Sequence, residues 1–210
     1  MTDPAPILAR VRDSMSRGDF AAAKAELAAA LQQLPRDPLL NNAMALTHLS
    51  TGQHASALPF LERALESRPN DPVLLVNMGR ALASLSRLDD ALPRFTRAAE
   101  VSPGLVEAWE GLTQVLRLKE RYTEAAERAR RGLSVRPDNA PLAALYTGLL
   151  MHLARVADAA AFARGFLARN PHPLVAGAYA AAITYHAGAE PGDVFQAQAA
   201  YGRMIAAPPP

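Results

Sequence analysis

Small and bulky apolar residues recur along this chain in a pattern with a period of 34 residues. One position of every repeat is alanine, namely Ala23, Ala57, Ala91, Ala125 and Ala159. Three residues before the alanine, four of the five repeats carry a bulky apolar side chain. Eight residues after it stand Leu31, Leu65, Ala99, Leu133 and Leu167. Apolar residues at such offsets share one helix face, so the pattern predicts an amphipathic helix in each repeat.

A proline closes each of these predicted helices. The prolines follow one another at intervals of 34 residues and are Pro35, Pro69, Pro103, Pro137 and Pro171. Because proline has no backbone N–H and cannot continue a helix, we expect each one to end a helix and begin the next repeat. Polar residues that can cap the following helix stand beside them, namely Asp37, Asn70, Asp71, Asp138 and Asn139.

The upstream half of each repeat predicts another helix, which packs against the helix that the proline closes. A column of small residues there holds Ala45, Gly79, Thr113 and Thr147. Small residues allow two helices to approach closely, and larger side chains fill the space on either side. Gly18 and Gly52 permit the tight bend between the two helices of a repeat. The sequence therefore predicts an all-α protein of stacked helix pairs, each sharing its core with the next.

These columns resemble the tetratricopeptide repeat. The family's first-helix motif is matched best by Met44-Ala45, Met78-Gly79 and Trp109 with Leu112-Thr113. The resemblance implies a right-handed superhelical solenoid of about five antiparallel helix pairs, followed by a C-terminal capping helix pair. We expect five repeats within residues 1–173 (about 4–37, 38–71, 72–105, 106–139 and 140–173). A degenerate sixth unit or capping helices would follow over 174–205, and a flexible proline-rich tail over 206–210.

Composition matters here chiefly through the chemistry that it disfavours. Half of the 210 residues are hydrophobic, which is enough for a sizeable core, and the formal net charge is only +2. The chain has no cysteine, so disulfides and thiolate metal sites are excluded. The five histidines lack ligand spacing, and neither a glycine-rich phosphate loop nor a His-Glu-x-x-His motif occurs. We therefore expect a protein that is not an enzyme and holds no metal and no cofactor.

Nucleic acid and membrane are disfavoured as partners. The one basic cluster, Arg128, Arg130 and Arg131, has acidic neighbours and lacks the interleaved aromatic residues that single-strand binding uses. Residues 172–189 contain no Asp, Glu, Lys or Arg, but they are rich in alanine and glycine and in phase with a first helix. We expect a buried helix there rather than a membrane span. The N-terminal residues lack the apolar run of a secretory signal, so we expect a cytoplasmic protein.

The candidate binding surface is the inner face formed by the first helices. In tetratricopeptide-like solenoids the second, fifth, sixth, ninth and twelfth residues of a unit face the groove. This resemblance selects Asn42, Leu46, Leu49, Val76, Asn77, Arg80, Glu110, Gln114, Arg117 and Met151. Amides can hydrogen-bond a peptide backbone in either direction, the two arginines can pair with an acidic group, and Leu46, Val76 and Met151 offer apolar pockets.

We interpret the chain as a non-catalytic scaffold that binds a partner peptide or protein segment in this groove. Two alternatives remain open. The segment with Pro191, Val194-Phe195 and Tyr201-Gly202 resembles the linker after the repeats in bacterial proteins similar to O-linked N-acetylglucosamine transferases. That resemblance implies an arm that recruits substrates or partners for a glycosyltransferase. The second alternative is a structural scaffold that forms homo-oligomers through an exposed end face or through its alanine-rich final units.

Overall fold

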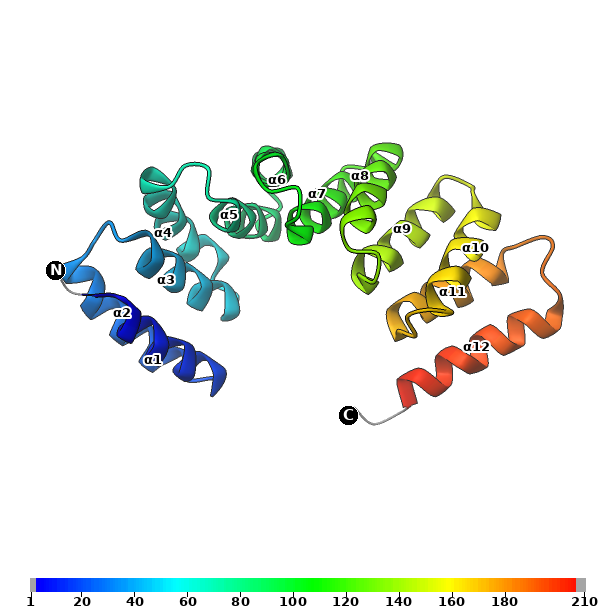
Figure 1. Cartoon of the computed structure of the whole chain (residues 1–210), viewed down its shortest axis with the longest axis horizontal. Coiled ribbons are helices and arrows are strands. Elements are labelled where there is room, and N and C mark those ends of the chain that lie inside the picture. Colours follow the sequence, from blue (N-terminus) through cyan, green and yellow to red (C-terminus); the bar gives the residue numbers. More distant parts are fainter. Residues whose placement is uncertain (1–2, 207–210) are drawn as a thin grey trace. The chain divides into compact units, whose positions relative to one another are not determined.

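The computed structural model describes residues 3–206 (Figure 1). Over that range it contains twelve α-helices and no β-strand. Backbone contacts divide the chain into two compact units, unit 1 (residues 1–111) and unit 2 (residues 112–210). The predicted all-α architecture of antiparallel helix pairs is confirmed. Of the tail predicted over 206–210, only residue 206 is described, as the last residue of a helix, and residues 207–210 lie outside the described part.

The helices follow one another at short intervals. Unit 1 contains α1 (Ala5–Ser16), α2 (Phe20–Gln33), α3 (Pro38–Ser50), α4 (His54–Ser67), α5 (Pro72–Ser84), α6 (Leu88–Val101) and the first part of α7 (Val106–Leu118). Unit 2 contains the rest of α7, α8 (Tyr122–Val135), α9 (Ala140–His152), α10 (Val156–Leu167), α11 (Pro173–Thr184) and α12 (Pro191–Ala206). The odd-numbered helices are the first helices of the repeats, and the even-numbered ones are the second helices.

The limits of the second helices follow two sequence columns. These helices begin at the position that the sequence assigns to a bulky residue, three residues before the column alanine. In the first four repeats they end two residues before the repeat proline, at Gln33, Ser67, Val101 and Val135. In the fifth repeat α10 ends at Leu167, four residues before Pro171. The helix boundaries are therefore fixed by local sequence signals.

Side-chain caps predicted from the sequence begin three of the first helices, and His172 caps a fourth, α11. The Asp37 carboxylate accepts hydrogen bonds of 2.9 Å from two backbone N–H groups of α3. Asp71 accepts two from α5, at 3.0 and 3.2 Å. The Asn139 side chain accepts one of 2.8 Å from α9. These bonds satisfy N–H groups that have no partner within the helix.

A residue in the left-handed backbone region joins the two helices of all five repeats. Gly18 and Gly52 have φ angles of 77° and 72°. The following repeats hold Ser86, Glu120 and Ala154 at this position, with φ angles of 59°, 57° and 58°. Because a Cβ atom crowds the backbone in this region, the three later repeats adopt the bend at an energetic cost that glycine avoids.

An exposed ion pair occupies the start of the second helix in the third, fourth and fifth repeats. The pairs are Arg87–Asp90 at 2.8 Å, Arg121–Glu124 at 2.6 Å and Arg155–Asp158 at 2.7 Å. The hydrogen bond from Arg121 holds the pKa of the Glu124 carboxyl below its ordinary value. Each acidic residue lies in the first turn of its helix, where the helix dipole favours negative charge. Since the side chains are exposed, we expect each pair to contribute little to stability.

Small residues make room for large ones at the helix crossings. The five column alanines are completely buried. Phe95 is 1 % exposed and packs against glycine on both sides. A Cβ atom added to Gly79 would lie 2.8 Å from the Phe95 ring, and one added to Gly111 would lie 2.1 Å from it. Glycine at these two positions is therefore a packing requirement of unit 1.

Within each unit the first helices form a continuous layer, whereas the second helices stay apart. In unit 1, α3 contacts both α1 and α5. In unit 2, α9 contacts α11. Among the described helices, α10 contacts its neighbours α9 and α11 but neither α8 nor α12. The second helices are therefore separated by grooves whose floor is a first helix.

The uncharged stretch 172–189 folds largely as α11. Its buried side chains are Val175, Ala176, Ala180, Ala182 and Ile183. The helix packs against α9, α10 and α12. None of the helices within residues 3–206 combines the length and the apolar character that a bilayer crossing needs.

Candidate functional site

All candidate residues of unit 1 except Glu110 lie on α3 and α5, which contact each other in the first-helix layer. On α3, Asn42 and Leu49 are half-buried and Leu46 is 36 % exposed. On α5, Arg80 is exposed, and no hydrogen bond or ion pair engages its side chain within the part of the chain that the structure describes. Val76 is only 3 % exposed, so its side chain belongs to the core of unit 1 and does not line a groove.

Two of these candidates form a direct hydrogen bond. The Asn77 Nδ2 atom donates to the Asn42 Oδ1 atom over 2.9 Å. Asn77 is 4 % exposed, whereas Asn42 is half-buried and reaches the surface. Asn77 therefore orients the Asn42 amide, and the Asn42 Nδ2 group makes no hydrogen bond within the described residues. An oriented amide with an open donor suits hydrogen bonding to a carbonyl group of a ligand.

A shallow pocket of about 200 Å³ lies beside the Asn42 amide. Its apolar wall includes Leu39 and Val73, which are 43 % and 48 % exposed. At its edge Arg68 and Asp71 approach each other to 3.8 Å, so their charges largely compensate each other. The pocket thus combines exposed apolar surface with one oriented amide.

Leu39 and Val73 were not among the candidates selected from the sequence. Both occupy the second position of their units, a position that the groove rule includes. Their position in the unit therefore indicates a groove residue, but valine and leucine at the start of a helix are easily attributed to the core. Their exposure shows that they belong to the surface around Asn42. We call Leu39, Asn42, Leu46 and Val73 the α3–α5 surface.

The remaining candidates lie on α7 and α9. Glu110, in the part of α7 that belongs to unit 1, is half-buried. In unit 2, the Arg117 Nε atom donates to the Gln114 Oε1 atom over 3.2 Å, so this guanidinium is already partly engaged. Met151 is half-buried and packs against the core cluster that includes Leu150. In unit 2 the structure therefore joins Gln114 to Arg117 and places Met151 against a core cluster.

Another asparagine of α3 has a structural role. Asn41 is completely buried, and its Nδ2 atom donates to the carbonyl oxygens of Pro35 and Asp37 over 3.0 and 2.8 Å. Trp109 stands at the equivalent position two repeats later, and its indole N–H donates to the Pro103 carbonyl over 2.8 Å. Both side chains therefore tie the repeat proline to the next first helix. Asn41 stabilises the scaffold on which Asn42 is displayed.

The described residues contain no cluster of three or more His, Asp or Glu side chains that could hold a metal ion. The arrangement in unit 1 is instead suited to non-covalent recognition. It offers an amide for a peptide backbone, apolar surface for side chains and one exposed arginine further along α5.

Family comparisons agree with the repeat period. Two family models, both described as tetratricopeptide repeat, match residues 14–75 and 76–144. Together these adjoining matches extend over residues 14–144, which is more than half of the 210 residues. No curated protein sequence matches the chain significantly.

Solved structures with the same fold come from several bacteria. PilF of Pseudomonas aeruginosa has a TM-score of 0.79 and 18 % identity, covering 96 % of this chain and 89 % of its own. A tetratricopeptide repeat protein of Parabacteroides merdae has a TM-score of 0.76 and 17 % identity, covering 98 % and 80 %. YrrB, described as having an unusual peptide-binding site, has a TM-score of 0.67 and 18 % identity, covering 84 % and 91 %. At these identities the similarity establishes the fold alone.

Proposed function

The chain belongs to the tetratricopeptide repeat family, and on that basis we propose that it is a non-catalytic scaffold that binds an extended segment of a partner protein. The binding site is the α3–α5 surface of unit 1. The observation that carries this proposal is the Asn77–Asn42 hydrogen bond, which presents an oriented amide beside exposed apolar side chains. YrrB, which is similar in fold, is described as a peptide-binding protein, and this supports the same class of function.

The chemistry of the surface defines the segment that it accepts. An extended peptide exposes backbone carbonyl groups that the Asn42 Nδ2 group can engage. The pocket between Leu39 and Val73 suits an apolar side chain of that peptide. Arg80 lies further along α5 and is exposed, so an acidic residue of the segment can pair with its guanidinium. We therefore propose a segment with one apolar anchor and one acidic group.

A peptide library displayed on phage tests this function. Peptides selected on the wild-type protein would be synthesised, and their affinities for variants would be measured by isothermal titration calorimetry. Val73→Asp places a charge in the pocket and should weaken binding about tenfold or more, because the apolar anchor loses its contact. Asn42→Ala should weaken binding several-fold through the lost hydrogen bond, by about 0.5–1.5 kcal/mol.

Val101→Asp is the matched control. Val101 ends the second helix α6 in the same unit and is 39 % exposed, similar to Val73 at 48 %. This variant should bind the selected peptides as the wild type does. Circular dichroism melting curves would confirm that each variant is folded. Equal losses in Val73→Asp and Val101→Asp, or wild-type affinity in both Val73→Asp and Asn42→Ala, would show that the segment binds elsewhere.

A second candidate function is self-association through α12. Phe195 on this helix is 73 % exposed and Ile205 is 59 % exposed, whereas Ala197 is the only buried residue of α12 among those described. Large exposed apolar side chains of this kind are often covered by another protein surface. Multi-angle light scattering after size exclusion would show a mass that rises with concentration and falls back in Phe195→Asp. A monomer at every concentration would eliminate this candidate.

A further inference from the structure

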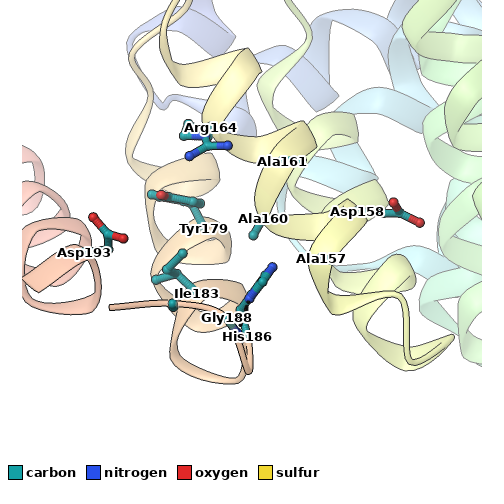
Figure 2. A pocket seen from close by; sticks show the side chains of 11 residues that line it. Ala157, Asp158, Ala160, Ala161, Arg164, Tyr179, Ile183, His186, Gly188 and Asp193 are labelled. Carbon is teal, nitrogen blue, oxygen red and sulfur yellow. Dashed lines mark hydrogen bonds between the residues drawn. The ribbon is translucent and has the colours of Figure 1, made fainter. Parts of the chain in front are cut away.

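Unit 2 contains two pockets that occupy equivalent places in successive repeats. The α8 pocket, of about 310 Å³, lies between α8, α9 and the residue before α10. The α10 pocket, of about 460 Å³, lies between α10, α11 and the start of α12 (Figure 2). Both occupy grooves beside second helices, which do not contact one another in this unit.

The second-helix side chains that line the two pockets correspond at a spacing of 34 residues. Arg130 of the α8 pocket corresponds to Arg164 of the α10 pocket, 34 residues later. The lining of each pocket also includes a tyrosine from the following first helix, Tyr146 of α9 in the α8 pocket and Tyr179 of α11 in the α10 pocket. Figure 2 shows Arg164 of α10 and Tyr179 of α11 among the side chains that line the α10 pocket. The combination of an arginine and a tyrosine is therefore repeated in space.

The same comparison explains why the α10 pocket is larger. Glu127 of the α8 pocket is replaced by Ala161 in the α10 pocket, and Thr123 is replaced by Ala157. The loss of these longer side chains opens the space in front of Arg164. In unit 1 the positions equivalent to Arg130 are Thr96, Glu62 and Ala28, so the arginine is a feature of unit 2.

Both repeated arginines are available to a ligand. Arg130 and Arg164 are exposed, and neither side chain makes a hydrogen bond or ion pair with the described residues. By contrast, Arg155 at the edge of the α8 pocket is held by Asp158 over 2.7 Å. Each pocket therefore contains one uncommitted guanidinium, whose planar fork matches the geometry of a carboxylate.

The formal net charge of unit 2 is more positive than that of unit 1. Unit 2 contains eleven Lys and Arg against seven Asp and Glu, a formal net charge of +4. Unit 1 contains eleven Lys and Arg against thirteen Asp and Glu, a formal net charge of −2. The net charge therefore favours an acidic partner at unit 2 over unit 1.

We propose that the α8 and α10 pockets are two subsites for an acidic protein segment, each taking one aspartate or glutamate side chain. The carboxylate pairs with Arg130 or Arg164, and the tyrosine hydroxyl of the same pocket can donate a second hydrogen bond. Glu127 in the α8 pocket and Asp193 in the α10 pocket disfavour a phosphate group, since it carries more negative charge than a carboxylate. The pockets are therefore better suited to a carboxylate than to a phosphate.

This site is distinct from the α3–α5 surface. The α3–α5 surface lies on first helices of unit 1, whereas both pockets lie beside second helices of unit 2. The two sites can be tested independently, because a substitution in one leaves the residues of the other unchanged. A scaffold with both sites can hold two different partner segments at the same time.

Fluorescence anisotropy with a labelled oligoglutamate peptide tests the proposal on the full chain. Arg130→Glu and Arg164→Glu should each weaken binding by about tenfold, because each replaces an attractive contact with a repulsive one. Ala161→Leu fills the α10 pocket from an exposed helix position without changing the charge, and it should weaken binding about threefold. Arg94→Glu is the charge-matched control, since Arg94 is exposed on α6 of unit 1 and is unpaired among the described residues.

The expected pattern is a loss in the three pocket variants and wild-type affinity in Arg94→Glu. Four outcomes would overturn the proposal. The first is that the wild type fails to bind the peptide, and the second is that Arg94→Glu weakens binding as much as Arg164→Glu does. The third is that Ala161→Leu leaves the affinity unchanged, and the fourth is that a single-stranded oligonucleotide displaces the peptide. The last outcome would identify a phosphate backbone as the ligand. All four substitutions are at exposed positions, and circular dichroism would confirm that each variant is folded.

Discussion

Replacing Ala154 by glycine should stabilise the protein, although the change removes a side chain. Ala154 joins α9 to α10 with a φ angle of 58°, in the left-handed region that a Cβ atom disfavours. The equivalent residue in the second repeat is Gly52, with a φ angle of 72°. The same bend is therefore made once with a strained residue and once with an unstrained one.

The size of the effect follows from two opposing contributions. A non-glycine residue in the left-handed region costs about 1–2 kcal/mol. Glycine loses more conformational freedom on folding, which costs about 0.5–1 kcal/mol. Ala154→Gly should therefore raise the free energy of unfolding by about 0.5–1 kcal/mol. Gly52→Ala should lower it by a similar amount. No atom lies within 4 Å of a Cβ atom placed on Gly52, so this loss would come from the backbone alone.

Urea unfolding followed by circular dichroism at the helix wavelength would measure both changes. The two variants should shift the unfolding midpoint in opposite directions from that of the wild type. Ser86→Gly, at the same position of the third repeat, should behave as Ala154→Gly does. A lower midpoint for Ala154→Gly, or a higher one for Gly52→Ala, would refute the argument that backbone strain at this position limits stability.

Three further sets of substitutions test other parts of the fold. Gly79→Ala should cost about 1–3 kcal/mol through overpacking against Phe95, and Phe95→Leu should recover part of that loss in the double variant, measured by urea unfolding. Asp71→Ala removes the acceptor for two backbone N–H groups of α5 and should lower the free energy of unfolding by about 1 kcal/mol. Asp71→Asn keeps a side-chain acceptor, so its melting temperature should stay close to that of the wild type. Arg121→Gln should raise the pKa of Glu124 towards its ordinary value in an NMR titration, because the hydrogen bond that lowers it is lost. A lowered carboxyl pKa contributes stability that is fully present above the ordinary pKa and is lost as the pH falls through the lowered pKa. The wild type should therefore lose this contribution on acidification, whereas Arg121→Gln lacks it at every pH.

The helix limits were predictable because they depend on neighbours in sequence. A proline two residues beyond the helix end and an aspartate before the next helix act within one turn, and both produce the expected structure at Pro69 and Asp71. The left-handed bends of the later repeats were less visible, because Ser86, Glu120 and Ala154 do not have the conformational signature of glycine.

The candidate surface was less predictable because exposure depends on how neighbouring helices approach. A positional rule selects Val76 and Asn77, yet both are buried in the folded chain, with exposed fractions of 3 % and 4 %. The hydrogen bond that orients Asn42 joins residues 35 positions apart, and no local pattern indicates it. For the pockets of unit 2 the sequence shows one pattern, the spacing of 34 residues between Arg130 and Arg164. That neither side chain has a partner among the described residues is a property of the folded chain.

The most direct measurement of partner binding at the α3–α5 surface is an NMR titration of the protein with a peptide selected on it. Asparagine side-chain amides give separate signals, so Asn42 reports on its own environment. Binding at the α3–α5 surface should shift the Asn42 side-chain signals and the backbone amide of Val73, and leave those of α6 unchanged. Shifts confined to the second helices, with the Asn42 signals unmoved at saturation, would contradict the proposed function.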